Sequence, residues 1–172
     1  YGIIYDAQFF QYLEDNIEQV ASLANEAAAH MTARSCEIKA DVVSQDEKEL
    51  GLRAILNFGH TAAHAIEKNT GYTKYNHGEA VAIGMVCAAY ISKALGMIDQ
   101  SVVDRVISLI LKLHLPIKAQ GCTVEDLYRD IFHDKKTVGG KVKWILMESI
   151  GQVCGNSNVP EEIVKGAMQK IV

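Results

Sequence analysis

A nearly continuous apolar stretch at residues 78–95 constrains the fold more than any other segment. Alanine, valine, isoleucine, methionine and cysteine fill most of its positions, and Gly96 follows it. A helix that is apolar all round is buried on most sides, so other helices must surround this one. Polar residues interrupt the stretch, and no apolar run approaches the ~18 residues that span a bilayer. We therefore expect a core helix and no membrane partner.

Helical spacing continues through most of the remaining chain. The sequence has only two prolines, Pro116 and Pro160, and such a scarcity of helix breakers favours a mostly helical protein. Apolar residues that recur at threes and fours predict further helices. The predicted helices cover residues 6–31, with Asp6 as N-cap, and then 31–44, 50–68, 99–113, 123–132 and a last segment that starts at Pro160.

One segment near the C-terminus has a different period. Val142, Trp144 and Leu146 alternate with other residues, which is typical of a strand, and residues 150–153 could return as its partner. We therefore predict a mainly α fold, a helical bundle domain with one small β-hairpin near residues 141–154. Residues 1–172 are expected to form a single domain.

Charge and cysteine content narrow the function classes. The formal net charge is −4, and this mild acidity argues against a nucleic-acid partner, which usually requires a basic excess. The four cysteines form no C-x-x-C pair, so we expect reduced thiols and a cytoplasmic protein. The chain opens on Tyr1 without an initiator methionine, which resembles the middle of a longer protein.

Polar residues gather on one side of the predicted helix 50–68. If that helix extends back by a turn, at ~100° per residue six polar side chains lie within about 40° of one line. They either form the wall of a site or a solvated stripe with ordinary ion pairs between neighbouring turns. These residues are Glu49, Arg53, Asn57, His60, His64 and Glu67.

Three histidines suggest a metal. His60 and His64 are four residues apart, which lets two imidazoles on one helix reach the same ion. His77 lies where a loop enters the apolar helix, and it could approach the same face. A catalytic Zn²⁺ usually takes three protein ligands plus water or substrate. All three histidines are therefore candidates, and a carboxylate could replace one of them.

Several runs carry a family resemblance: Arg53–Thr61, His64–Glu67, His77–Met85, Tyr1–Ile4 and Asp134–Lys136. Together they closely resemble the C-terminal half of 3-dehydroquinate synthase, a family within the sugar phosphate cyclases. The resemblance covers essentially the whole chain. It implies a mainly helical domain that faces an N-terminal NAD-binding domain across the active-site cleft, and a homodimer is expected for the full-length protein. That NAD-binding domain is absent from these residues.

The resemblance also assigns residues. Zn²⁺, for which Co²⁺ can substitute, is held in the family by two histidines and a glutamate, and the histidines match His60 and His77. The glutamate would lie four residues before Tyr1. His64 matches a substrate-side residue rather than a ligand. Other polar active-site positions match Lys39, Glu49, Arg53 and Asn57, and either Lys135 or Lys136 matches a lysine on the phosphate side.

The implied reaction converts a sugar acid phosphate, 3-deoxy-D-arabino-heptulosonate 7-phosphate, to 3-dehydroquinate and phosphate. It is a lyase reaction of the shikimate pathway, which leads to aromatic amino acids, and it uses NAD⁺ without net redox change. Two alternatives stay open: another sugar phosphate cyclase, such as 2-deoxy-scyllo-inosose synthase, and an iron-type alcohol or glycerol dehydrogenase. Without the glutamate and the NAD domain, we expect the 172 residues alone to be inactive.

Overall fold

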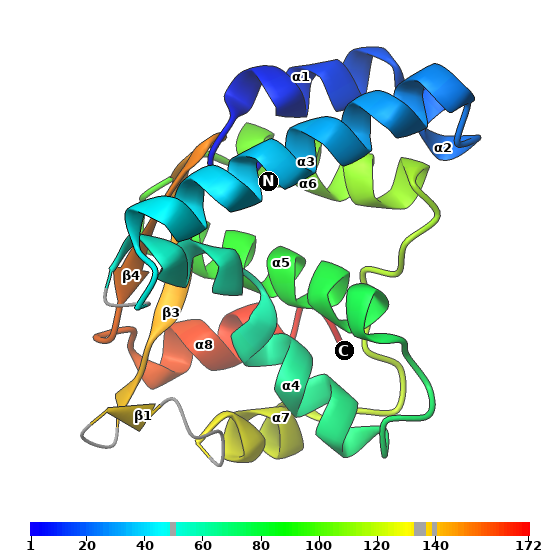
Figure 1. Cartoon of the computed structure of the whole chain (residues 1–172). Helices are drawn as coiled ribbons and strands as arrows, with labels where there is room; N and C mark the ends of the chain where they lie inside the picture. Colours follow the sequence, from blue (N-terminus) through cyan, green and yellow to red (C-terminus); the bar gives the residue numbers. More distant parts are fainter. Residues whose placement is uncertain (49–50, 133–136, 139–140) are drawn as a thin grey trace.

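The computed structural model describes residues 1–48, 51–132, 137–138 and 141–172. As predicted, it is mainly helical (Figure 1). The helices are α1 (Ala7–Asp15), α2 (Ile17–Ala21), α3 (Asn25–Gln45), the 3₁₀ helix η1 (Leu52–Asn57), α4 (His60–Asn69), α5 (His77–Ala94), α6 (Gln100–Lys112), α7 (Val124–Ile131) and α8 (Glu161–Met168). The strands are β1 (Thr137–Val138), β2 (Lys141–Val142), β3 (Trp144–Ser149) and β4 (Gln152–Asn156).

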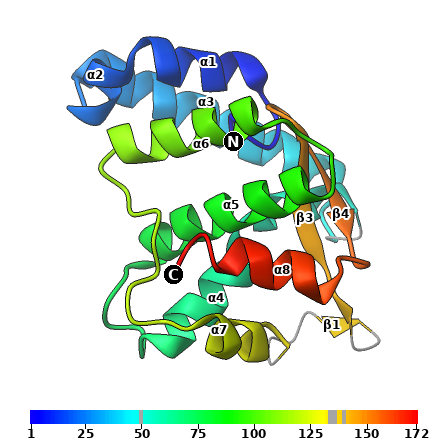
Figure 2. The same cartoon turned by 180° about the vertical axis from the view of Figure 1, so that it is seen from behind.

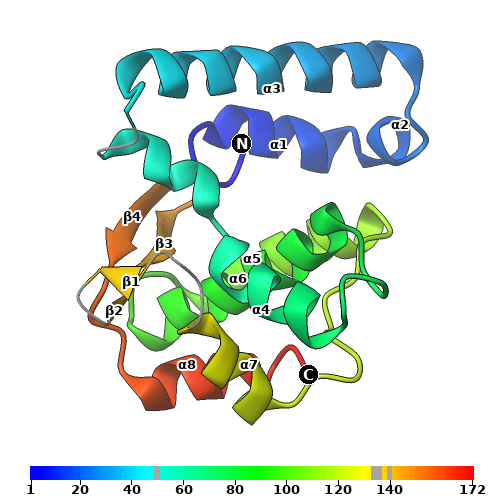
Figure 3. The ribbon, with the colours of Figure 1, turned by 60° about the horizontal axis from the view of Figure 1, so that its bottom comes forward.

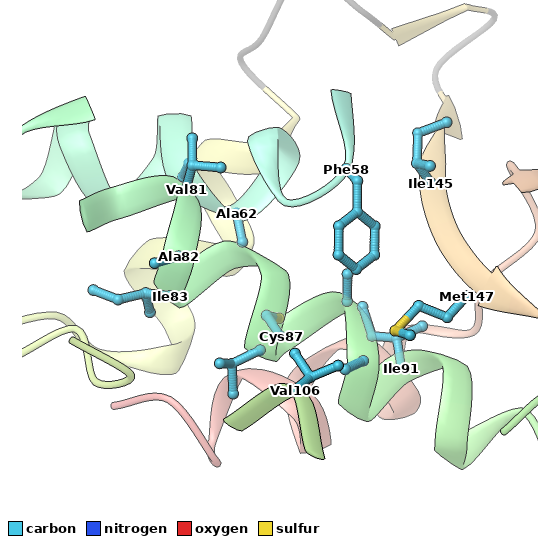
Figure 4. Packing of buried hydrophobic residues seen from close by; sticks show 14 of the residues in the cluster. Phe58, Ala62, Val81, Ala82, Ile83, Cys87, Ile91, Val106, Ile145 and Met147 are labelled. Atoms are coloured by element: carbon cyan, nitrogen blue, oxygen red, sulfur yellow. The ribbon is translucent and has the colours of Figure 1, made fainter. Parts of the chain in front are cut away.

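Helix α5 lies at the centre of the molecule, as its apolar sequence predicts. It packs against α4, α6, α8 and β3 (Figures 1 and 2). Figure 4 shows the resulting core, in which Phe58 approaches α5 from the connection between η1 and α4, Met147 from β3, and Val106 from α6. Across the described part of the chain, none of the helices has the length and apolar character that a membrane crossing requires.

The predicted hairpin is confirmed, but it spans residues 144–156 and so lies slightly nearer the C-terminus than the predicted range 141–154. Strands β3 and β4 pair antiparallel, with Trp144 opposite Asn156 and Leu146 opposite Cys154. Four successive residues of β3, from Trp144 to Met147, are buried, and the Met147 N–H donates to the Ser92 hydroxyl of α5 at 2.8 Å. A second short antiparallel pair, β1 with β2, lies just before this hairpin, whereas the sequence predicted only one hairpin.

The N-terminal helices form a layer of their own beside α6 (Figure 3). Asp6 caps α1 as predicted, because its carboxylate accepts the N–H groups of Gln8 and Phe9. The predicted boundary at residue 31 is wrong, since α3 runs through it and the chain turns at 22–24 instead. There Leu23 adopts a left-handed backbone (φ 54°) and is 67% exposed, so the helix predicted for residues 6–31 is interrupted at this residue.

The single helix predicted for residues 50–68 is also wrong. It divides into η1 and α4 at Gly59, which has φ 82°. This glycine lies against α5, where an added Cβ would come within 2.8 Å of the Val81 carbonyl oxygen and the Met85 nitrogen. Arg53 and Asn57 belong to η1. The common helical face predicted for the polar stripe therefore holds only within α4, for His60, His64 and Glu67.

Candidate functional site

Three imidazole rings come together where the start of α4 meets the start of α5. The ring centroids of His60 and His77 are 5.2 Å apart, those of His60 and His64 are 5.8 Å apart, and those of His64 and His77 are 6.4 Å apart. His60 and His64 lie one turn apart on α4, and His77 is the first residue of α5. The cluster thus depends on the packing of these two helices.

A hydrogen bond at Nδ1 orients His60. This atom lies 3.3 Å from the Phe58 carbonyl oxygen, and because a carbonyl oxygen only accepts, Nδ1 carries the proton. The lone pair is then on Nε2. The left-handed turn at Gly59 separates the two partners, so the backbone break that begins α4 also orients the ring.

His77 is oriented by a carboxylate on the neighbouring helix. Its Nδ1 lies 2.9 Å from Oε1 of Glu67, which is only 9% exposed. A carboxylate oxygen accepts the Nδ1 proton, so in the neutral imidazole the lone pair is again on Nε2. His77 and His60 therefore share one tautomer, reached through two different acceptors.

A capping box fixes the backbone that carries His77. The Asn76 side chain accepts the Glu79 N–H, and the Glu79 carboxylate accepts the Asn76 N–H, each at 2.9 Å. These bonds satisfy donors that every helix start leaves without intrahelical partners. Because His77 follows Asn76 directly, the capping box also fixes the backbone position from which the His77 side chain extends.

The histidine pair fits part of a metal site. Zinc is bound by neutral imidazole nitrogens, and its histidine ligands typically donate their other N–H to a carboxylate or a carbonyl. His60 and His77 both show this second feature. Among the residues that the structure describes, no group of three or more His, Cys, Asp or Glu side chains is arranged to hold an ion. The pair therefore fits two ligand positions of such a site.

The remaining predicted residues are distributed over three parts of the chain. Arg53 and Asn57 lie half-buried on η1, and the Arg53 guanidinium donates to the Glu47 carbonyl at 2.9 Å. Lys39 is exposed on α3, which packs against η1. Three further predicted residues, Glu49, Lys135 and Lys136, lie outside the described residues.

Sequence reasoning placed Glu67 on the polar stripe but gave it no role in the site. Its spacing already contained the signal, because residues three and seven positions apart share one face of an α-helix. Glu67 is thus on the side of α4 that carries His64 and His60. What the spacing does not contain is the approach of His77 from α5, which makes the Glu67 carboxylate a hydrogen-bond acceptor.

A second buried carboxylate secures α4 from another side. Asp130 of α7 is 8% exposed and accepts hydrogen bonds from the Lys68 ammonium at 2.7 Å and from the Asn69 amide at 2.8 Å. These partners immediately follow Glu67 in the sequence. Helix α4 is therefore tied to α7 by one carboxylate and to α5 by the other.

Comparison with known proteins identifies close relatives. The family model for the C-terminal part of 3-dehydroquinate synthase matches residues 1–137. A 3-dehydroquinate synthase from Shewanella sp. (strain MR-4) is 46% identical over 96% of this chain and 46% of its own length. Another from Synechocystis sp. (strain ATCC 27184 / PCC 6803 / Kazusa) is 47% identical over 98% of this chain and 47% of its own length. The chain thus spans about half the length of these relatives.

Solved structures share the fold at lower identity. The 2-epi-5-epi-valiolone synthase ValA from Streptomyces hygroscopicus subsp. jinggangensis 5008, with NAD⁺ and Zn²⁺ bound, has a TM-score of 0.85 at 23% identity, covering 99% of this chain and 48% of that one. A 2-deoxy-scyllo-inosose synthase in complex with carbaglucose-6-phosphate, NAD⁺ and Co²⁺ has a TM-score of 0.65 at 24% identity, covering 78% and 39%.

Proposed function

The chain belongs to the 3-dehydroquinate synthase family, and on that premise we propose that it is the metal- and substrate-binding domain of such an enzyme. The proposed reaction converts 3-deoxy-D-arabino-heptulosonate 7-phosphate to 3-dehydroquinate and phosphate in the cytoplasm, within the shikimate pathway. The observation that carries the proposal is the 5.2 Å approach of His60 and His77. Both histidines lie in the segment that matches the family model.

His60 and His77 are the proposed holders of Zn²⁺ or Co²⁺, each through Nε2. The hydrogen bonds from their Nδ1 atoms support this, since they leave Nε2 as the atom with the lone pair. A metal bound there would supply Lewis-acid polarisation of substrate oxygens. The third ligand is proposed to be the glutamate that the family resemblance assigns to a position four residues before Tyr1.

The neighbouring polar residues are proposed to bind and orient the substrate. A sugar acid phosphate carries a carboxylate and a phosphate, so a chain of net charge −4 must provide local cations. The cations would be Arg53, Lys39 and one of Lys135 and Lys136.

Two further residues are proposed to act on the phosphate side of the substrate. There His64 and Asn57 would form hydrogen bonds and help to move a proton, a role that the 5.8 Å ring separation of His60 and His64 supports. Glu49 remains a predicted active-site residue.

NAD⁺ does not fit the described residues of this chain. Their sheets are two-stranded and antiparallel, whereas dinucleotides bind at the carboxyl edge of a parallel sheet with a glycine-rich first turn. The NAD site is therefore proposed to belong to an N-terminal nucleotide-binding domain that would close the cleft over the histidines. A homodimer of the full-length protein remains a prediction.

The test is to assay the natural full-length gene product for phosphate release from the seven-carbon substrate. We expect His60→Ala and His77→Ala each to lower turnover by more than about 100-fold, because loss of even an outer-shell partner of a metal ligand costs 10–100-fold. Bound zinc, measured by atomic emission, should fall in parallel. His30→Ala removes an exposed histidine on α3 and serves as the matched control. Full zinc content in His77→Ala would contradict the proposed metal site.

A related cyclase activity is the second candidate, because the fold is shared with 2-deoxy-scyllo-inosose synthase. The higher identity to 3-dehydroquinate synthases favours the first. Offering the same enzyme a six-carbon sugar phosphate separates the two cyclases. Offering an alcohol with NAD⁺ and following NADH absorbance tests the dehydrogenase alternative, which requires net hydride transfer.

The 172 residues by themselves are proposed to be inactive, since two imidazoles supply fewer than the three protein ligands usual for a catalytic zinc. Phosphate release should appear only after the separate N-terminal half, with its glutamate, is added together with NAD⁺ and Zn²⁺. Turnover by the 172 residues alone would show that the domain boundary or the cofactor site is misplaced.

A further inference from the structure

The Glu67 carboxylate is buried without a cationic lysine or arginine in any ion pair described for it. Its described partner is His77, whose side chain is 59% exposed, while the carboxylate side chain is 11% exposed. The adjacent lysine, Lys68, turns instead to Asp130 of α7. A buried carboxylate is costly unless its oxygens are hydrogen-bonded, so this position is occupied at an energetic cost that an apolar residue would avoid.

The bond has a direction that matters for metal binding. A carboxylate at Nδ1 selects the tautomer in which Nε2 is the ligand, fixes the ring plane and makes the imidazole more basic. His60 obtains the same tautomer from the neutral Phe58 carbonyl at 3.3 Å, a longer contact than the 2.9 Å bond of His77. The two proposed ligands are therefore supported unequally, and His77 has the charged partner.

We propose that Glu67 is a positioning residue for metal binding: it accepts the Nδ1 proton of His77 and thereby presents Nε2 to the ion. This inference rests on the proposed function, in which His77 is a metal ligand. It gives a reason for a buried acid on α4 that faces the His77 imidazole of α5. If Glu67 only linked α4 to α5, its removal would lower stability but would leave the His77 tautomer unchanged.

The experiment measures Zn²⁺ affinity in the natural full-length gene product, by competition with a chromophoric chelator. We expect Glu67→Ala to weaken Zn²⁺ binding by about 10- to 100-fold, the usual effect of removing an outer-shell partner. Glu67→Gln keeps the volume and one acceptor oxygen but loses the charge, so it should fall between wild type and Glu67→Ala. If Glu67→Ala does not fold, the glutamine variant carries the test.

The second readout needs neither metal nor activity. In the metal-free protein labelled with ¹⁵N-histidine, the wild-type His77 shifts should report a protonated Nδ1 and an unprotonated Nε2. In Glu67→Ala the population should move toward the tautomer with the proton on Nε2, which is the commoner form when no acceptor holds Nδ1. Unchanged His77 shifts in both Glu67 variants would overturn the proposal.

Asp130→Asn is the matched control. Asp130 is a second buried carboxylate, 8% exposed against 9% for Glu67, and it also bonds across to a neighbouring helix. Its replacement should lower thermal stability but leave Zn²⁺ affinity and the His77 shifts unchanged. An equal loss of affinity in Asp130→Asn and Glu67→Ala would reduce Glu67 to a structural residue and overturn the proposal.

His77→Ala separates this inference from the proposed function. If His77→Ala loses Zn²⁺ and the Glu67 variants keep wild-type affinity, the metal site stands and the role of Glu67 fails. If His77→Ala keeps wild-type affinity, the proposed metal site itself fails, and the role of Glu67 fails with it.

Discussion

Helix α3 and the α4–α5 pair are both rich in alanine, but they use it in opposite ways. In α3, Ala29, Ala33 and Ala40 are exposed, and only three side chains of its 21 residues are buried. In α4 and α5 the alanines are buried at positions 62, 63, 65, 80, 82, 88 and 89, and Ala94, the last residue of α5, is exposed. In α3 alanine contributes mainly its high helix propensity, whereas between α4 and α5 its small side chain lets the two helices pack closely.

The difference explains where the candidate site lies. At the α4–α5 contact the two backbones nearly touch, since an added Cβ on Gly84 would lie 2.0 Å from the Gly59 carbonyl oxygen. Side chains at this contact are held in fixed positions by the closely packed backbones. His60 and His77 need such positions, because each is hydrogen-bonded to its own acceptor. Helix α3 is held at its surface by polar pairs such as Arg34 with Asp6, and the site residue predicted on it, Lys39, is exposed.

The largest effect that tests this comparison is expected from Gly84→Ala. The new methyl group would collide with the backbone of Gly59, and backbone cannot rotate away as a flexible side chain can. We expect a loss of at least about 3 kcal/mol in the free energy of unfolding, at the upper end for an overpacked core. Urea denaturation followed by circular dichroism measures it.

Gly166→Ala is the control for that substitution. Gly166 lies within α8, and an added Cβ there meets no atom within 4 Å. Replacing a helical glycine by alanine should then stabilise the protein by roughly 0.5–1 kcal/mol. If Gly84→Ala also stabilised, the close approach of α4 and α5 would be wrong.

A smaller effect separates packing from propensity. Ala63→Gly at the contact should cost about 1.5–2 kcal/mol, because it loses both helix propensity and a fully buried methyl group. Ala33→Gly on the exposed side of α3 should cost only the propensity, about 1 kcal/mol. Equal losses in the two variants, measured by the same denaturation, would mean that the buried methyl contributes nothing.

The helices themselves could be predicted wherever the local pattern decides. Asp6 as a cap was sufficient for the start of α1 but not for its end at Asp15, and the all-round apolar character of residues 78–95 was sufficient for the central helix α5. The break at Gly59 was missed because a polar and apolar period continues across it. The left-handed turn is required by contact with Val81 and Met85 of α5, and a single-helix pattern carries no information on that contact.

In the candidate site, too, features within one helix could be predicted from the sequence and contacts between two helices could not. The spacing of His60 and His64 indicated a shared face from the sequence, and both are on α4. The bond between Glu67 and His77 joins two helices, so no periodicity within either one predicts it. Assignment of His77 to the site came from family resemblance and from its place before an apolar helix, and its role as a ligand stays a prediction.

The smallest expected loss of stability comes from breaking the link between α1 and α3 at Asp6, and this loss depends on pH. Asp6 caps α1 with one carboxylate oxygen, and the other accepts two bonds from Arg34 of α3, each at 2.7 Å. Asp6→Ala removes the cap and the link between the helices, and we expect a loss of about 1 kcal/mol at pH 7. Because no close backbone contact is involved, this loss should stay below that of Ala63→Gly.

The pH dependence follows from the ionisation of Asp6. Burial raises the pKa of this carboxyl, but the Phe9 N–H and the Arg34 guanidinium outweigh burial and hold the pKa below its ordinary value. A carboxyl with a lowered folded pKa stabilises the protein above its unfolded pKa of about 4, and that contribution disappears as pH falls through the lower folded value. The difference in the free energy of unfolding between wild type and Asp6→Ala should therefore be constant near neutrality and narrow below about pH 4.

The control is Asp6→Asn, which retains a cap without the charge. The difference in the free energy of unfolding between Asp6→Asn and Asp6→Ala should not change with pH. A difference between wild type and Asp6→Ala that persists unchanged into acid would mean that the charge of Asp6 adds no stability through the α1 cap or through Arg34 of α3.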